Sequence, residues 1–264
     1  MASALLIDGS AQRKPWLVMV HGTSHDHRVF EAQIETFQSE FRLLLIDLPG
    51  HGLSSTLSGP YGPVEYAEHV AGTLASHGVE QAHFWGSHTG AGVGLALAVE
   101  HPSLFRSLVL EAPVIPGRNP DVVLRTLSKV CELAKSGSPH AALEFWWQES
   151  CWFDYIRAHP QRTRAEALKK IVFEFSAVPW TDTSLPAQPI DVSESLAQLT
   201  IPTLVYNGAF DHAGFLETAH ELDECLPRCR RALVEKSGGF PAWENPSATN
   251  ALVKGYYKSI GEFV

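Results

Sequence analysis

The sequence predicts an α/β protein with a mostly parallel, doubly wound sheet that carries helices on both faces. Short apolar runs alternate with helical segments along most of the chain, as is typical of such a sheet. A turn framed by Gly86 and Gly90 lies between an apolar run and a segment rich in small residues. The 264 residues, 45% of them hydrophobic, suit one compact domain with an insertion better than two independent domains.

Five apolar runs predict strands in the first part of the chain. The run Trp16–Val20 has no polar residue, which is typical of a parallel strand buried on both faces. The helix predicted after the glycine turn ends before Pro102, which cannot continue it. The predicted strands are Ala4–Ile7 at an edge, Trp16–Val20, Phe41–Asp47, Ala82–Trp85 and Ser107–Leu110, and the helices are Val29–Phe37, Val64–His77 and Gly90–Glu100.

The pattern changes to helices without strands from Pro116 to Leu199. We interpret residues 116–199 as a helical cap inserted after the sixth strand, with residues 1–115 and 200–264 forming the core. Within it, Leu168, Ile171, Val172 and Phe175 form an apolar stripe of helical spacing that indicates packing on the core. The core is predicted to resume with a strand at Thr203–Asn207, a helix ending at Cys225, a strand at Ala232–Glu235 and a last helix after Pro246.

The glycine turn has the spacing of a nucleophile elbow, in which the middle residue of Gly-x-x-x-Gly is held on a strained strand-to-helix turn. With glycines at 86 and 90 the middle residue is His88. A frame centred on Ser87 would need glycines at 85 and 89, where the chain has tryptophan and threonine. The sequence therefore predicts an elbow without a serine at its apex.

Four motifs occur in the order found in the α/β-hydrolase superfamily, which the chain resembles from end to end. They are His21-Gly22, the segment Asp47–Ser54, the elbow, and the segment Phe240–Pro246. The resemblance implies an α/β-hydrolase fold. It also implies that the nucleophile position holds His88, that the position of the catalytic histidine falls on Gly239, and that the acid position is kept as Asp211. A serine-hydrolase triad would then lack two of its three members.

The segment His25–Phe30 is similar to one in the cofactor-free dioxygenases that cleave hydroxy-oxoquinolines. That resemblance implies a histidine base paired with a carboxylate after the strand that follows the elbow helix, a position held here by Glu111. Zearalenone-type lactone hydrolases also resemble the chain at this glutamate and in the Trp-Gly entry to the elbow. The resemblance to the dioxygenases implies an enzyme without a cofactor.

We expect His88 and Glu111 to be the catalytic residues, because a carboxylate bonded to an imidazole raises its basicity and fixes its tautomer. Backbone amides at Thr23 or Ser24 and at Thr89 are expected to form an oxyanion hole. We expect no metal site, since the histidines lack a metal-binding pattern. The expected substrate-binding residues are His25, His27, Trp146, Trp147, Trp152, Trp180, Asp211 and His212.

The charge balance argues for a small-molecule substrate. A net charge of −9 without basic runs disfavours nucleic acid and anionic membranes as partners. We expect a cytoplasmic protein with reduced cysteines, and a homodimer stays open. The leading hypothesis is a cofactor-free enzyme acting by proton transfer on a cyclic or aromatic substrate, through elimination, isomerisation, ring cleavage or lactone opening. The alternatives are a ligand-binding pseudo-hydrolase without turnover and an ester or lactone hydrolase of unusual mechanism.

Overall fold

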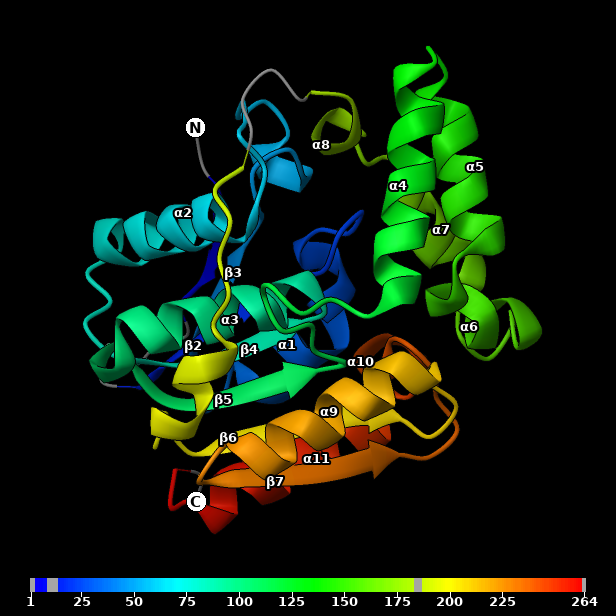
Figure 1. The fold of residues 1–264 in the computed structure, drawn as a ribbon. Helices are drawn as coiled ribbons and strands as arrows, with labels where there is room; N and C mark the ends of the chain where they lie inside the picture. The colour runs from blue at the N-terminus through cyan, green and yellow to red at the C-terminus, as the bar shows by residue number, and fades with distance from the viewer. Residues whose placement is uncertain (1–2, 9–13, 183–186, 263–264) are drawn as a thin grey trace.

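A seven-stranded sheet forms the centre of the molecule (Figure 1). The computed structural model describes residues 3–8, 14–182 and 187–262. The strand order is β1-β3-β2-β4-β5-β6-β7, and all pairs are parallel except the edge pair β1–β3. The mostly parallel, doubly wound sheet predicted from the sequence is confirmed. The strands are β1 (Ala4–Ile7), β2 (Trp16–Val20), β3 (Arg42–Ile46), β4 (Ala82–Ser87), β5 (Phe105–Glu111), β6 (Thr203–Gly208) and β7 (Cys229–Val234).

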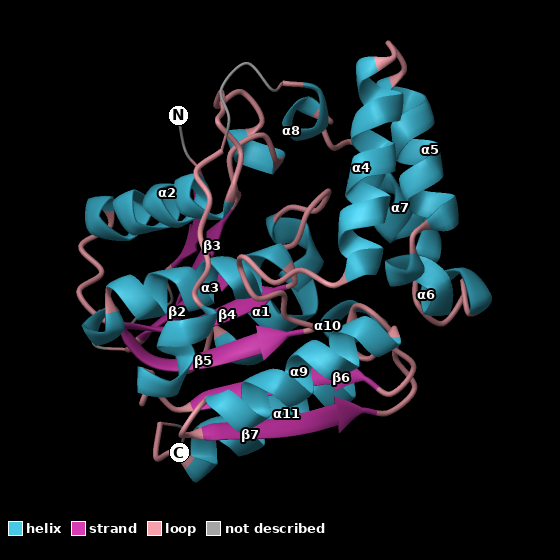
Figure 2. Cartoon of the chain, viewed as in Figure 1, coloured by secondary structure: helices cyan, strands magenta, loops and turns pink. Residues whose placement is uncertain are grey.

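Helices occupy the connections between strands (Figure 2). The core helices are α1 (Glu31–Phe37), α2 (Pro63–Ser76), α3 (Thr89–Glu100), α9 (Ala213–Cys225), α10 (Pro241–Glu244) and α11 (Pro246–Ser259). The helices between β5 and β6 are α4 (Asp121–Lys135), α5 (Pro139–Glu149), α6 (Asp154–Ala158), α7 (Ala165–Phe173) and α8 (Val178–Thr181). Short 3-10 helices are η1 (His27–Phe30), η2 (Gly52–Ser54), η3 (Pro102–Leu104), η4 (Cys151–Phe153) and η5 (Ser193–Gln198).

Alternate residues of each central strand point to two separate hydrophobic layers. In β2, Leu17 and Met19 join the layer that includes residues of α1 and α11. Trp16, Val18 and Val20 join the layer formed with α2, α3 and α9. This alternation follows from the pleat of a strand, and it explains why the parallel strands are apolar at every position.

Helices α4 to α7 lie beyond the carboxyl ends of the strands (Figure 1). They follow β5, the fifth strand of the described residues, whereas the sequence predicted an insertion after a sixth strand. The predicted stripe is part of this packing, since Leu168 and Val172 of α7 are fully buried. No helix in the described part of the chain combines the length and apolar character that crossing a membrane requires.

Candidate functional site

The turn between β4 and α3 holds His88 at its apex with φ of 46° and ψ of −106°. A side chain is costly at positive φ. Both flanking glycines are required: a Cβ on Gly86 would lie 2.5 Å from the backbone of α3, and one on Gly90 would lie 2.1 Å from the Val20 carbonyl oxygen. The elbow is therefore formed as the spacing indicates, with a histidine at its apex.

The His88 ring is neutral and held in one tautomer. Its Nε2 lies 2.7 Å from the Gly239 carbonyl oxygen, and because a carbonyl only accepts, Nε2 carries the proton and donates it. The Nδ1 atom is left with its lone pair and has no hydrogen-bond partner among the described residues. Burial lowers the pKa of His88 to about 4, against the opposing effect of the Gly239 carbonyl. The rings of Phe215 and Phe240 contact it at centroid distances of 5.2 and 4.7 Å.

Glu111, the last residue of β5, does not form the hydrogen bond with His88 that the sequence suggested. Its Oε1 accepts a hydrogen bond from the Ala242 amide at 2.7 Å, while the His88 imidazole donates its hydrogen bond to the Gly239 carbonyl. Burial raises the pKa of Glu111 to about 7, although the Ala242 amide and the Ser87 hydroxyl favour the charged form. The two side chains are thus held by the same loop, 238–242, and not by each other.

The Ser87 side chain lies on the same side of the elbow as Glu111. It lines a second void, of about 10 Å³, together with His25, Glu111 and Phe240. Ser87 does not line the main cavity described below. A serine nucleophile at this position would therefore lie outside the main cavity.

Two buried carboxyl groups hold the loop 238–242. Glu244 accepts hydrogen bonds from the amides of Gly238 and Phe240, the latter at 3.4 Å, and Glu111 accepts from Ala242. Burial raises the pKa of Glu244 to about 8. This loop presents the carbonyl that fixes the tautomer of His88.

Trp152, in the helical segment between β5 and β6, packs over Gly239, where the resemblance to the superfamily places the catalytic histidine. A Cβ on Gly239 would lie 2.7 Å from the Trp152 carbonyl oxygen and 3.2 Å from its Cα. Backbone atoms cannot move aside as a flexible side chain does. The absence of an imidazole at 239 is therefore built into the contact between cap and core.

Two of the three residues expected to supply an oxyanion hole face the main cavity. Thr23 and Thr89 line it, and their hydroxyls bond to each other at 2.8 Å. The Thr89 amide is the first of α3, where an N–H has no partner within the helix. Ser24 does not line the cavity: it is buried at φ 64°, and its hydroxyl accepts from Trp146 Nε1 at 2.7 Å.

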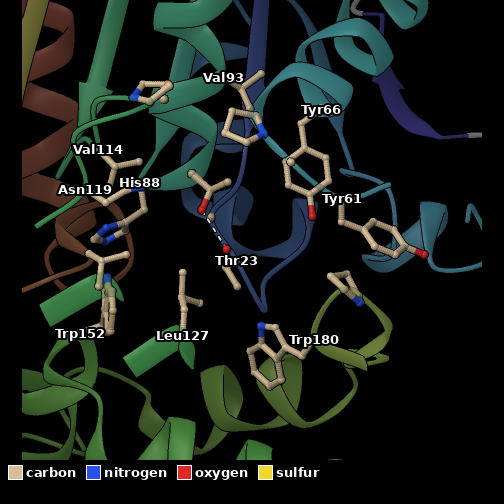
Figure 3. Close-up of a pocket in the computed structure, with 18 of the residues that line it drawn as sticks. Thr23, Tyr61, Tyr66, His88, Val93, Val114, Asn119, Leu127, Trp152 and Trp180 are labelled. Atoms are coloured by element: carbon tan, nitrogen blue, oxygen red, sulfur yellow. Dashed lines mark hydrogen bonds between the residues drawn. The ribbon is translucent and has the colours of Figure 1, made fainter. Parts of the chain in front are cut away.

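The main cavity has a volume of about 260 Å³ and lies between the core and the cap (Figure 3). His88 lines one side, beside Trp152, and α2 and α8 contribute the opposite side. None of its lining residues among the described part of the chain is Asp, Glu, Lys or Arg. The lining residues are Gly22, Thr23, Tyr61, Gly62, Pro63, Tyr66, His88, Thr89, Gly92, Val93, Val114, Pro116, Asn119, Val123, Leu127, Cys131, Trp146, Trp152, Pro179, Trp180 and Phe240.

Three of the predicted substrate-binding residues, Trp146, Trp152 and Trp180, line this cavity. Their indole rings form one cluster, with the Trp146 centroid 4.8 Å from Trp152 and 5.5 Å from Trp180. Trp147 does not line the cavity, because it is buried against Phe153. The aromatic wall predicted from the cap is present, with one tryptophan fewer.

Four further predicted binding residues lie outside the cavity. His25 is buried against Phe240 and lines the smaller void. His27 is bound to Asp47 through Nδ1 at 2.8 Å, and that bond raises its pKa. Asp211 accepts from Asn207 and from the His212 amide, and burial raises the Asp211 pKa to about 7. The exposed His212 caps α9 through the Gly214 amide.

Sequence reasoning missed three polar residues of the cavity wall. Tyr61 and Tyr66 lie opposite His88 and Asn119 lies on the same side as His88 (Figure 3), and none of them belongs to a motif. The available signal was the pair of tyrosines around the Gly62-Pro63 start of α2, where a helix begins near the carboxyl edge of the sheet. Among the described residues, no three His, Cys, Asp or Glu side chains are grouped to hold a metal ion.

The chain belongs to the α/β hydrolase fold family, whose profile matches residues 15–246. It is 28% identical over 261 residues to a pimeloyl-[acyl-carrier protein] methyl ester esterase of Aeromonas hydrophila, covering 88% of this chain and 91% of that protein. It is 22% identical over 254 residues to 3-oxoadipate enol-lactonase 1 of Acinetobacter baylyi, covering 94% of this chain and 91% of that protein.

A solved structure supports the same fold. A hydrolase from Pseudomonas aeruginosa superimposes with a TM-score of 0.82 at 21% identity, covering 96% of this chain and 92% of that one. The relatives are by name hydrolase-type enzymes, so these similarities support an enzyme.

Proposed function

We propose that this chain is a cofactor-free and metal-free enzyme in which neutral His88 removes a proton from a small cyclic or aromatic carbonyl compound held under the cap. The observation that carries the proposal is the state of the imidazole at the elbow. Its Nε2 proton is engaged by Gly239, which leaves the Nδ1 lone pair as the only basic atom of a ring that lines the cavity.

The amides of Thr23 and Thr89 would stabilise the negative charge that develops on the substrate oxygen. Hydrogen-bond donors fixed in place before the reaction stabilise an enolate or phenolate as well as a tetrahedral adduct. Proton removal can then lead to elimination, isomerisation, ring cleavage or the opening of a lactone by water. The resemblance to cofactor-free dioxygenases and zearalenone-type lactone hydrolases motivates this range of reactions.

Glu111 takes an indirect part in the proposed chemistry. It anchors the Ala242 amide in the loop whose Gly239 carbonyl orients His88. Glu111 is then a positioning residue, and its loss is expected to act through the orientation of the imidazole. This replaces the direct acid–base contact as the way in which His88 and Glu111 work together.

Two observations favour other functions. The low pKa of His88, about 4, makes it a weak base, which favours a ligand-binding pseudo-hydrolase without turnover. The names of the relatives favour ester or lactone hydrolysis by an unusual route. A cytoplasmic location and a homodimer stay predictions from the sequence.

The test is a turnover screen with neutral aryl lactones, enol esters and cyclic ketones, using His88→Ala and Glu111→Gln. A positioned general base contributes about 10² to 10⁴-fold, so His88→Ala is expected to lower kcat by that range. The double variant should be little worse than the worse single variant, because the two residues form one unit.

Two variants serve as controls in this screen. His27→Ala alters a histidine that is bound to Asp47 and does not line the cavity, and Glu217→Gln alters an exposed residue of α9. Both should keep their activity. Full activity of His88→Ala would contradict the proposal, and binding without turnover across the panel would favour the pseudo-hydrolase.

A further inference from the structure

The side of the cavity opposite His88 carries two buried donors without acceptors. Tyr66 of α2 is 7% exposed and Trp180 of α8 is 3% exposed, and both line the cavity. Among the described residues, neither the Tyr66 hydroxyl nor Trp180 Nε1 has a hydrogen-bond partner, and both atoms are open to the cavity. Figure 3 shows both groups directed into the space between them and Thr23.

Three other buried indole N–H groups have partners within the chain. Trp85 Nε1 donates to Tyr206, Trp146 Nε1 to Ser24, and Trp243 Nε1 to the Thr163 carbonyl. Buried Tyr O–H and Trp N–H groups usually find a hydrogen-bond partner, because a buried donor without an acceptor costs free energy. The Tyr256 and Tyr257 hydroxyls also lack a partner among the described residues, but neither residue lines the cavity, whereas the donors of Tyr66 and Trp180 point into it (Figure 3). A ligand atom in the cavity can therefore complete the bonds of Tyr66 and Trp180.

The remaining hydroxyls around the cavity are already engaged. Thr23 and Thr89 bond to each other, and the Tyr61 hydroxyl donates to the Leu57 carbonyl at 2.9 Å. Asn119 is only half-buried. Tyr66 and Trp180 are therefore the buried donors that stay available on the side opposite His88.

The acceptor that they bind carries no formal charge. The described lining includes no Lys or Arg to balance a carboxylate or phosphate, and no Asp or Glu to balance an ammonium group. Burying an unpaired charge is far more costly than burying a neutral carbonyl. A cavity of about 260 Å³ also falls below the roughly 300–1,000 Å³ of pockets for drug-sized ligands.

We infer that Tyr66 and Trp180 form a second polar subsite, and that the ligand is a compact neutral molecule with oxygen acceptors at two ends. One oxygen binds the amides of Thr23 and Thr89, and the other binds the Tyr66 hydroxyl and Trp180 Nε1. The first of these contacts rests on the proposed function; the second follows from the unpaired donors alone. Aromatic walls on either side select a flat or cyclic body between the two oxygens.

The experiment measures binding of simple aryl ketones to the full chain by ligand-observed NMR. Acetophenone supplies one oxygen, the ortho, meta and para diacetylbenzenes supply two at different spacings, and para-acetylbenzoate replaces the second ketone by a charge. The best diacetylbenzene is expected to bind roughly 2- to 12-fold more tightly than acetophenone, the range of one net hydrogen bond. The carboxylate should bind less tightly than acetophenone.

The Tyr66→Phe and Trp180→Phe variants should reduce this advantage while leaving acetophenone binding near its starting value. Tyr61→Phe is the matched control, because its hydroxyl is used by Leu57, and the advantage should remain. The subsite would be overturned if both variants lost affinity equally for acetophenone and the diacetylbenzene, or if the ratio of the two affinities stayed unchanged in both variants. It would also be overturned if para-acetylbenzoate bound more tightly than acetophenone, or if no ketone bound at millimolar concentration.

The same titrations in His88→Ala separate this inference from the proposed function. The advantage of the second oxygen should persist there, since the subsite lies on the other side of the cavity. If the chain shows no turnover but keeps the Tyr66-dependent affinity ratio, His88 is not a general base and the subsite stands. If the chain shows His88-dependent turnover but no such ratio, the proposed base stands and the subsite is refuted.

Discussion

Replacing Glu111 with glutamine is expected to change how stability depends on pH. Burial raises the pKa of this carboxyl from 4.5 to about 7, so the native state holds a proton that the unfolded chain releases. A difference of this size corresponds to about 3 kcal/mol between the two protonation states. Glu111 is 2% exposed, so solvent screening does not reduce the effect greatly.

The direction follows from proton linkage. Because the folded pKa lies above the unfolded one, the native state binds more protons between pH 4.5 and 7. The contribution of Glu111 to the free energy of unfolding is fully present below pH 4.5 and is lost as the pH rises through about 7. Glutamine, which resembles the protonated acid and does not titrate, removes this loss.

The assay is urea unfolding of the starting chain and of Glu111→Gln at intervals from pH 5 to 8. The stability of the variant relative to the starting chain should increase by about 3 kcal/mol over this range. Taking the difference between the two proteins cancels the contributions of groups that the substitution leaves unchanged. Glu217→Gln, at an exposed position of α9, is the control and should show a constant difference. A pH-independent difference for Glu111→Gln would refute a raised pKa at this site.

Two further predictions concern the expectation that the chain lacks a serine-hydrolase triad. Gly239→His should lower the Tm by several degrees, because its Cβ would lie 2.7 Å from the Trp152 carbonyl oxygen, and thermal melts test this. The starting chain should stay unlabelled by serine-directed phosphonates. Stoichiometric labelling of Ser87 would contradict the geometry of the elbow. The low pKa of His88, about 4, keeps its base form populated in mild acid, so kcat/KM should show no acid limb attributable to it between pH 7 and 5. A limb near pH 6.5 that disappears in His88→Ala would refute this.

The fold was predictable because its signals are local. Uniformly apolar runs such as Trp16–Val20 mark strands covered on both faces, and both layers around β2 confirm this. The glycine spacing around His88 was equally informative, since the close approaches at Gly86 and Gly90 exclude any side chain. The five strands predicted before residue 116 are all present, so the helical insertion follows the fifth strand of the described residues, and only its numbering after a sixth strand was wrong.

The polar half of the cavity had no local signal. Tyr66 and Trp180 come from α2 and α8, which are more than a hundred residues apart, and only the packing of the cap on the core brings them to one cavity. Histidines attracted the prediction instead, yet His27 is bound to Asp47 and His25 is buried behind Phe240. Residue chemistry identified candidates, but the direction of each side chain depended on tertiary packing.

The expected contact between His88 and Glu111 failed for a reason contained in the sheet register. Ser87 is the partner of Glu111 in the β4–β5 ladder. Paired residues of neighbouring strands point to the same face, and the next residue points to the other, so the partner of the carboxyl is Ser87 and not His88. The Ser87 hydroxyl accordingly favours the charged form of Glu111, and His88 turns toward the Gly239 carbonyl. Adjacent strand ends bring two residues near each other, but the parity of the register decides whether their side chains meet.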